Sequence, residues 1–305
     1  MVLGRGPDQT PKVKFRVHGG GGAVNPPAIR SPFTGTEREH AMSLYAGTFS
    51  IVAHDPAAGV CGVAVASRMP AIGALTVFAH ADVGAVATQA LINPLLGVDA
   101  LELLRTLPAD EALAAVLADD PEPDSRQVAV VDRTGRAAAH TGFMTHPWCG
   151  HRTGEGYAVA GNILTGGATL DAMAQVWESG ADLPFDERLL RALEAGQAAG
   201  GDRRGRQSAA LYVHTGNPYP HLDLRVDEHT DPVAELRRVH GVARRELLPF
   251  VEALPTRENP AGAFDRLHEE ETVEGRTNAC ASDPRGREHR PEGRWADGAG
   301  ASLEG

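Results

Sequence analysis

The residue best placed for nucleophilic chemistry is Thr48, which follows Gly47 and opens the β-branched, apolar run TFSIVAHD. A threonine hydroxyl attacks an amide carbonyl only when a base lies within reach. If the chain were cleaved before Thr48, the new α-amine would be that base, because its ordinary pKa of about 7.7–8.0 leaves part of it neutral near pH 7. The alternative is that Thr48 is simply a β-branched residue at the start of a strand.

An asparagine and an arginine-rich segment are the next candidates. Asn162 lies in the apolar run GYAVAGNIL, where its amide could donate to the oxyanion of a tetrahedral intermediate or satisfy nearby loop backbone. The segment DRRGRQS precedes another apolar run. Arg206, the arginine nearest that run, could hold a substrate carboxylate or carbonyl while Asp202 fixes its orientation. The alternative for this segment is a solvated loop.

Other polar residues stand at the ends of apolar runs and could converge on one pocket. Thr88 and Gln89 are the most notable, because their run VGAVATQAL is otherwise apolar. Each such residue, taken alone, could equally be a local cap or turn contact. The residues expected to bind substrate are Arg68, Thr88, Gln89, His140, Asp202 and Arg206.

Two patterns limit the chemistry further. The only lysines are Lys12 and Lys14, so a Schiff-base lysine, a Ser-Lys dyad and a P-loop lysine are excluded from Thr48 onward. The segment HPWCGH, with His146, Cys149 and His151, suggests a metallohydrolase as an alternative, but its spacing matches no standard zinc pattern. We therefore expect no metal and no cofactor.

Charge and hydropathy limit the partners and the location. The formal net charge of −11 argues against a nucleic-acid partner, which usually meets a basic surface. No apolar run is long enough to cross a bilayer, and the first residues lack the apolar stretch of a signal peptide. The three cysteines include no CxxC pair. We expect a cytoplasmic protein that acts on a small molecule, and association into a homo-oligomer is left open.

The order of elements predicts the fold class. Residues 1–47 and 255–305 are rich in Gly, Pro and charge and are expected to be a disordered leader and tail around one domain, 48–254. Within the domain, predicted strands come in blocks (48–55, 59–67, 74–81, 83–91, 126–132, 136–142, 156–164, 207–215 and 222–229). Predicted helices fill the remaining blocks (99–107, 110–118, two near 170–193, and 232–252). This blocked order predicts an α+β protein, and two sheets each covered by helices give a four-layer αββα sandwich.

Several of these motifs, in this order, resemble the domain of unknown function 1028 family. They are TFSIVAHDPAAGVCGVAVAS, VGAVATQALINP, AAHTG, GYAVAGNIL and GGDRRGRQSAAL, and the resemblance extends from Thr48 to Val239. That family is placed among the N-terminal nucleophile (Ntn) hydrolases. The resemblance implies the αββα sandwich, Thr48 as nucleophile and, by analogy with Ntn hydrolases, Asn162 as oxyanion donor. It thus implies an amidohydrolase that forms an acyl-enzyme on Thr48.

The sequence departs from that family at one point. In the family the threonine typically follows the initiator methionine, whereas here at least the segment from Met42 to Gly47 precedes Thr48. Exposing the Thr48 amine would need autoproteolysis or another protease, and a Gly–Thr junction resembles the self-processing site of some Ntn hydrolases. Without cleavage the chain would be a non-catalytic binding or assembly module that keeps the fold, which is the alternative function.

Overall fold

The computed structural model describes residues 47–264, so most of the predicted leader and tail lies outside the described residues. The elements, in order, are β1 (Thr48–Asp55), β2 (Val60–Ser67), α2 (Gly73–Thr76), β3 (Val77–His80), β4 (Gly84–Ala90), α3 (Pro94–Leu103), α4 (Ala109–Asp119), η1 (Pro123–Ser125), β5 (Arg126–Asp132), β6 (Ala137–Thr141), β7 (Gly150–Gly154), β8 (Tyr157–Asn162), α5 (Ala168–Ser179), α6 (Phe185–Ala198), β9 (Ser208–His214), β10 (Pro220–Val226), α7 (Pro232–Glu246) and α8 (Leu248–Ala253).

The strands form two antiparallel sheets. One has the order β10-β9-β2-β1-β8-β7 and the other the order β3-β4-β5-β6. Strand β1 lies inside the larger sheet, between β2 and β8, and its first residue, Thr48, is paired with Ser67 on one side and Asn162 on the other. The start of β1 is therefore held from both sides, and this is the position that the sequence predicts for a nucleophile.

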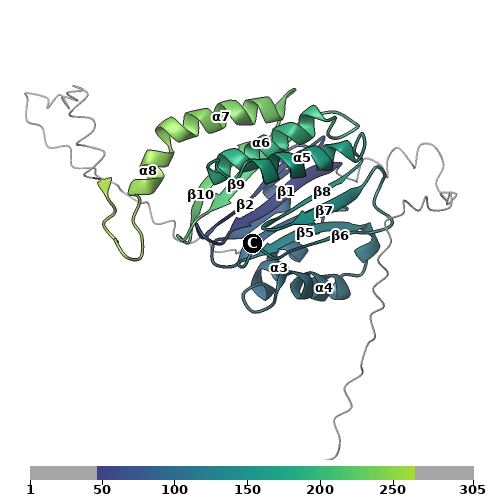
Figure 1. Cartoon of the computed structure of the whole chain (residues 1–305), viewed down its shortest axis with the longest axis horizontal. Helices are drawn as coiled ribbons and strands as arrows, with labels where there is room; N and C mark the ends of the chain where they lie inside the picture. The colour runs from purple at the N-terminus through teal and green to yellow at the C-terminus, as the bar shows by residue number, and fades with distance from the viewer. Residues whose placement is uncertain (1–46, 265–305) are drawn as a thin grey trace, which may run out of the picture. The chain divides into compact units, whose positions relative to one another are not determined.

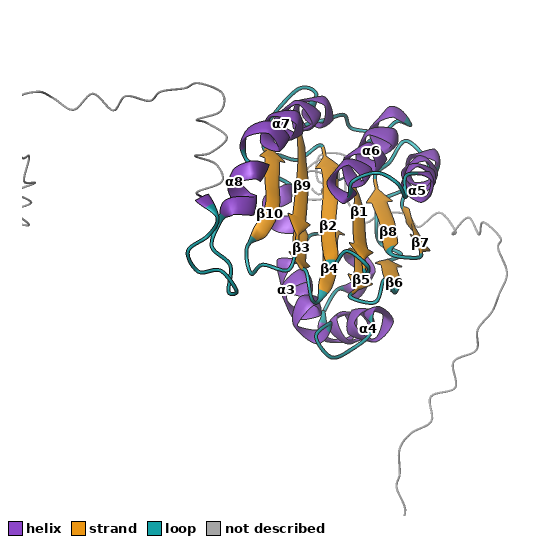
Figure 2. Cartoon of the chain, turned by 60° about the vertical axis from the view of Figure 1, so that its left-hand side comes forward, coloured by secondary structure: helices purple, strands orange, loops and turns teal. Residues whose placement is uncertain are grey.

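Alternating side chains of β1 face two different apolar layers. Phe49 and Ile51 pack with residues of α5, α6 and α7, whereas Val52 packs with alanines and valines of β4 and β5 in the other sheet. A third cluster joins the far face of that smaller sheet to α3 and α4. Figures 1 and 2 show these helices on the outer sides of the two sheets. The α+β prediction is confirmed.

Four sequence predictions need correction in detail. The strand predicted over 74–81 is the short helix α2 followed by β3, and the hydroxyl of Thr76 donates to the carbonyl of Ile72 within that turn. Helix α3 begins at Pro94, five residues earlier than predicted, because the Asn93 side chain caps it. The polar strand β7 was not predicted. The single helix predicted over 232–252 is two helices, α7 and α8, with Pro249 in the first turn of the second.

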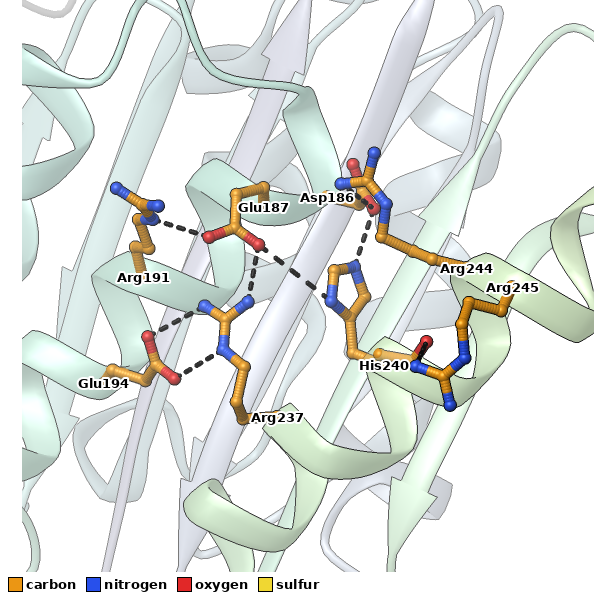
Figure 3. A network of polar contacts seen from close by, with 9 residues as sticks. Asp186, Glu187, Arg191, Glu194, Arg237, His240, Arg244 and Arg245 are labelled. Atoms are coloured by element: carbon orange, nitrogen blue, oxygen red, sulfur yellow. Dashed lines mark hydrogen bonds and ion pairs between the residues drawn. The ribbon is translucent and has the colours of Figure 1, made fainter.

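Charged side chains join α6 and α7 on the outer side of the larger sheet (Figure 3). The guanidinium of Arg237 on α7 binds Glu187 at 2.5 Å and Glu194 at 2.7 Å, both on α6. Beside it, the ring of the buried His240 lies 2.7 Å from the carboxylate of Asp186. These contacts hold α6 and α7 against each other. They lie far from the start of β1 in sequence and on the opposite face of the sheet from the Thr48 side chain, so we assign them a structural role.

Among the helices of residues 47–264, none is both long and apolar enough to span a membrane.

Candidate functional site

The site lies where several strands of both sheets end together. The larger sheet contributes the row Ser208, Ser67, Thr48 and Asn162, which are neighbours across β9, β2, β1 and β8. The smaller sheet contributes Gln89 and Gln127, which face each other across β4 and β5. The larger-sheet row and the glutamine pair are all fully or almost fully buried. A row of buried polar residues inside two apolar sheets is the pattern expected of a binding or catalytic site.

The carbonyl of Gly47, which belongs to the peptide bond before Thr48, is held by two donors. The Ser67 hydroxyl donates to it at 2.5 Å, and Arg204 Nη2 donates to it at 3.2 Å. The Thr48 hydroxyl in turn donates to Ser67 Oγ at 3.3 Å. Two donors on one carbonyl oxygen, one of them charged, stabilise negative charge on that oxygen.

Asp202 positions the arginine of this arrangement. Its buried carboxylate accepts hydrogen bonds from Arg204 Nη2 at 2.8 Å and from the Arg204 backbone N–H at 2.9 Å, and it also accepts from the backbone N–H of Arg68 at 3.0 Å. Gly47 fits closely here, because a Cβ on it would lie 2.6 Å from Asp202 Oδ2 and 2.7 Å from Arg204 Nη2. The sequence motif Gly-Thr therefore has a steric reason at its glycine.

Gln127 orients the polar side chains between the sheets. Its Nε2 donates to the carbonyls of Gly150 and Gly161, at 3.0 and 2.9 Å, and these two acceptors fix which end of the amide faces them. Its Oε1 must then face Gln89 and Asn162, and it accepts from Gln89 Nε2 at 2.8 Å and from Asn162 Nδ2 at 3.0 Å.

The same orientation leaves an acceptor of Asn162 unused. Because Asn162 Nδ2 faces Gln127, its Oδ1 points elsewhere, and this buried atom has no hydrogen-bond partner among residues 47–264. Asn162 is the direct cross-strand neighbour of Thr48, so both side chains stand on the same face of the sheet. A buried acceptor without a partner costs about 1–3 kcal/mol, and a bound N–H group would remove that cost.

Backbone strain marks the same strand ends. Ile163, directly after Asn162, has φ 53°, and Ala90, directly after Gln89, has φ 72°. A β-branched residue in the left-handed region is a true outlier, and such strain of about 1–3 kcal/mol concentrates at functional sites. The strain turns the chain sharply just beyond the two amide side chains.

The structure brings only part of the predicted site residues to Thr48. Asn162, Gln89 and Asp202 lie at the site as described. The backbone of Arg68 joins it through Asp202, while its exposed side chain binds Gln207 on the rim. Arg68 is therefore a rim residue.

The remaining three predicted residues do not reach Thr48. The Thr88 hydroxyl donates to the Asn93 carbonyl beside α3, and the His140 ring contacts the Pro123 carbonyl at 2.9 Å, both on the side of the smaller sheet that carries α3 and α4. Strand alternation explains this, since Thr88 is adjacent to Gln89 and must face the other way. Arg206 forms an exposed ion pair with Asp231 at 2.9 Å.

The residues of the site that lie outside the predicted set include Ser67, Gln127 and Arg204. Gln127 is the polar residue at the start of the apolar run RQVAVVD, the same signal that identified Gln89. Arg204 could not be separated from Arg203 and Arg206, because the choice depends on which arginine the loop turns toward Asp202. Only a fold can decide that.

The segment proposed as a metal-site alternative makes other contacts. Cys149 Sγ donates to the Thr145 carbonyl at 3.4 Å, and His151 Nδ1 lies 2.9 Å from Thr141 Oγ1, the hydroxyl that also accepts from Gln127. Burial lowers the pKa of both His146 and His151 and raises the pKa of the Cys149 thiol. Within residues 47–264, no three His, Cys, Asp or Glu side chains gather as a metal site would need.

The Gln127 network gives a stability prediction. Replacing Gln127 with Leu leaves the partly buried carbonyl of Gly150, the buried carbonyl of Gly161 and the buried amides of Gln89 and Asn162 without this partner. Each unpaired buried group costs about 1–3 kcal/mol, so we expect the free energy of unfolding to fall by at least about 3 kcal/mol. Urea unfolding checks this, with the exposed Gln175→Leu on α5 as the matched control. Equal losses in the two variants would contradict the role given to Gln127.

A second buried polar group lies at the other end of the sheets. His54, Cys61 and His214 are neighbours across β1, β2 and β9, and the ring of His80 from the smaller sheet stacks on His214 at 4.9 Å between centroids. The Nδ1 atoms of His54 and His80 are buried and have no hydrogen-bond partner within the described part of the chain. Burial raises the pKa of the Cys61 thiol to about 12, so this cysteine is not a nucleophile at neutral pH.

These histidines predict loss of stability in acid. Burial lowers the pKa of His54 and of His214 below 6.5, although Asp55 and Asp82 partly oppose this. At pH values between the lowered pKa and about 6.5, the unfolded chain binds more protons than the folded chain. The free energy of unfolding therefore decreases as the pH decreases, by up to about 1.4 kcal/mol per pH unit for each histidine. Urea unfolding at pH 7.5 and 5.5 measures this. We expect His54→Gln to reduce the difference, and equal stability at both pH values would refute the prediction.

The fold and the site together define a class of protein. It is an α+β protein with two facing antiparallel sheets, helices on both outer sides, and a threonine-centred polar site at one end of the sheets.

Comparisons with known proteins identify the family of this chain. The model of the family of unknown function DUF1028 matches residues 48–236, beginning at Thr48, and the chain belongs to this family. The crystal structure of protein SPO2555 from Silicibacter pomeroyi, a DUF1028 protein by its description, is similar with a TM-score of 0.65 and 30% sequence identity, over 71% of this chain and 98% of that chain. No curated protein matches this chain.

Proposed function

We propose that this protein is an amidohydrolase of the Ntn type, in which Thr48 becomes the nucleophile after the chain is cleaved between Gly47 and Thr48. The observation that carries the proposal is the Gly47 carbonyl, held by Ser67 Oγ and Arg204 Nη2 directly beside the Thr48 hydroxyl. The arrangement of two facing sheets between outer helices supports assigning the four-layer αββα sandwich of Ntn hydrolases.

The proposed cleavage step uses these contacts. Thr48 Oγ attacks the carbonyl carbon of Gly47, and its hydroxyl proton is transferred to the nitrogen of Thr48, which leaves as an amine. The C–N bond breaks while an ester to Thr48 Oγ forms. Arg204 and Ser67 stabilise the oxyanion in between. Water then hydrolyses the ester, which frees the carboxyl group of Gly47 and restores the Thr48 hydroxyl.

The mature reaction uses the same groups on an external amide. The Thr48 α-amine takes the hydroxyl proton as Oγ attacks the substrate carbonyl and then gives it to the leaving amine. Water then hydrolyses the acyl ester on Thr48 Oγ, which releases the acid and restores the hydroxyl. The vacated place of Gly47 receives the acyl group, with its oxygen toward Ser67 and Arg204. The resemblance implies that Asn162 is the oxyanion donor. Since its Nδ2 already donates to Gln127, we instead give its Oδ1 the role of acceptor for an N–H group.

One observation favours a second function. Thr48 is fully buried at the start of β1. A chain that is never cleaved would therefore keep its nucleophile covered and would act as a binding or assembly module.

The amino terminus of the purified protein separates the two functions. Intact mass and terminal sequencing of the protein, with any tag at the carboxyl end, identify that terminus. A new terminus at Thr48 supports the hydrolase. A terminus upstream of Thr48 that persists on incubation supports the binding module.

A further inference from the structure

Two arginines beside the site have no acidic partner within residues 47–264. Arg68 and Arg203 are both exposed, and no carboxylate of the described part of the chain forms an ion pair with either of them. Their backbones are nevertheless fixed at the site. The N–H of Arg68 binds Asp202 Oδ2, and the N–H of Arg203 binds the carbonyl of Ile163 at 2.8 Å.

Their neighbours in the same loop are different. Arg204 is neutralised by Asp202, and Arg206 by Asp231. The chain as a whole carries a net charge of −11 and has carboxylates available for pairing. The guanidinium groups of Arg68 and Arg203 lie on the rim of the site, and no described carboxylate forms an ion pair with them. They make the rim locally cationic in an otherwise acidic protein, and a cationic rim attracts anions.

The interior of the site adds a second requirement. Asn162 Oδ1, beside Thr48, is a buried acceptor that no donor of the described residues satisfies, and it needs an N–H group. Ser67 Oγ and Arg204 Nη2 are donors, and they need a carbonyl oxygen. A secondary amide, with one carbonyl and one N–H, satisfies both.

We propose that the substrate is an N-acylated amino acid, whose carboxylate is bound by Arg68 and Arg203 and whose amide N–H donates to Asn162 Oδ1. This inference rests on the proposed function. Guanidinium groups bind carboxylates by paired, charge-assisted hydrogen bonds, which suits this recognition. Hydrolysis adds water across the amide bond and releases a carboxylic acid and a free amino acid.

The test compares acids with their neutral counterparts on the protein whose amino terminus is Thr48. A panel of N-acetylated amino acids is assayed for release of the free amino acid, beside the same compounds with the carboxylate capped as a methylamide. We expect the acids to have the lower KM. Arg68→Gln and Arg203→Gln should each raise the KM for the acids roughly tenfold, with little change in kcat, and should leave the capped compounds unaffected.

The control is Arg105→Gln. Arg105 is an exposed arginine that follows the carboxyl end of α3 and pairs with Glu102, and its replacement should leave KM and kcat unchanged. If acids and capped compounds are hydrolysed equally, or if neither the Arg68 nor the Arg203 variant changes the KM for the acids, this inference is overturned while the proposed function stands. The inference is also overturned if the processed protein hydrolyses other amides but none of the acids. A terminus upstream of Thr48 instead overturns the proposed function itself.

Discussion

Replacing Thr48 with Ala is expected to stop both cleavage of the chain and hydrolysis of amides. The variant lacks the oxygen that attacks the carbonyl, so the precursor should persist with Gly47 attached, and amide turnover should fall by at least about 10⁴-fold. Intact mass follows the first effect and an amide-release assay the second. Thr48→Ser keeps an equivalent hydroxyl and should still be cleaved.

The serine variant also guards against a trivial explanation. Thr48 is fully buried at the start of β1, so the alanine variant loses some packing and its bond to Ser67. If misfolding were the cause of inactivity, its unfolding transition would shift far more than that of Thr48→Ser. Thr153→Ala, an exposed threonine on β7, is the matched control and should be cleaved normally. Normal cleavage of Thr48→Ala would contradict the proposal that Thr48 is the nucleophile.

The sequence predicted the strands of the site well because their signals are local. β1, β2 and β8 are short apolar runs bounded by turns, and they lie where the pattern predicted them. The strand β7 was not predicted because its sequence, GHRTG, lacks apolar alternation. It forms instead by antiparallel pairing with β8 and supplies hydrogen-bond partners for the β8 backbone. Tertiary pairing of this kind leaves little trace in a single sequence.

The site residues likewise divide into features with a local sequence signal and features that only the fold sets. Thr48 and Asn162 could each be proposed as site residues from the sequence, yet their direct pairing follows from a register that only the fold shows. Thr88 and Gln89 illustrate the limit, since adjacent residues in a strand face opposite sides. The sequence marked both as unusual but could not say that Gln89 faces Gln127 between the sheets and Thr88 faces α3.

Arg204 is expected to have the largest effect on cleavage after the nucleophile, because it is the charged donor on the Gly47 carbonyl. Removing one preorganised donor to an oxyanion typically slows a reaction by about 10²–10³-fold. We therefore expect Arg204→Gln to slow cleavage before Thr48 by about that factor, measured as the rate at which the precursor mass disappears. Arg206→Gln removes the same charge two residues later, from an exposed pair with Asp231, and should leave the rate unchanged.

The stability of the Arg204 variant has to be measured beside its rate, because Asp202 is buried and loses its ion-pair partner. A double variant, Asp202→Asn with Arg204→Gln, removes the uncompensated charge and should recover stability without recovering cleavage. If cleavage returns together with stability, Arg204 acts only through the fold and the charge on the oxyanion is stabilised by other groups. If cleavage stays slow in a stable protein, the guanidinium itself stabilises the transition state, as its place on the Gly47 carbonyl predicts.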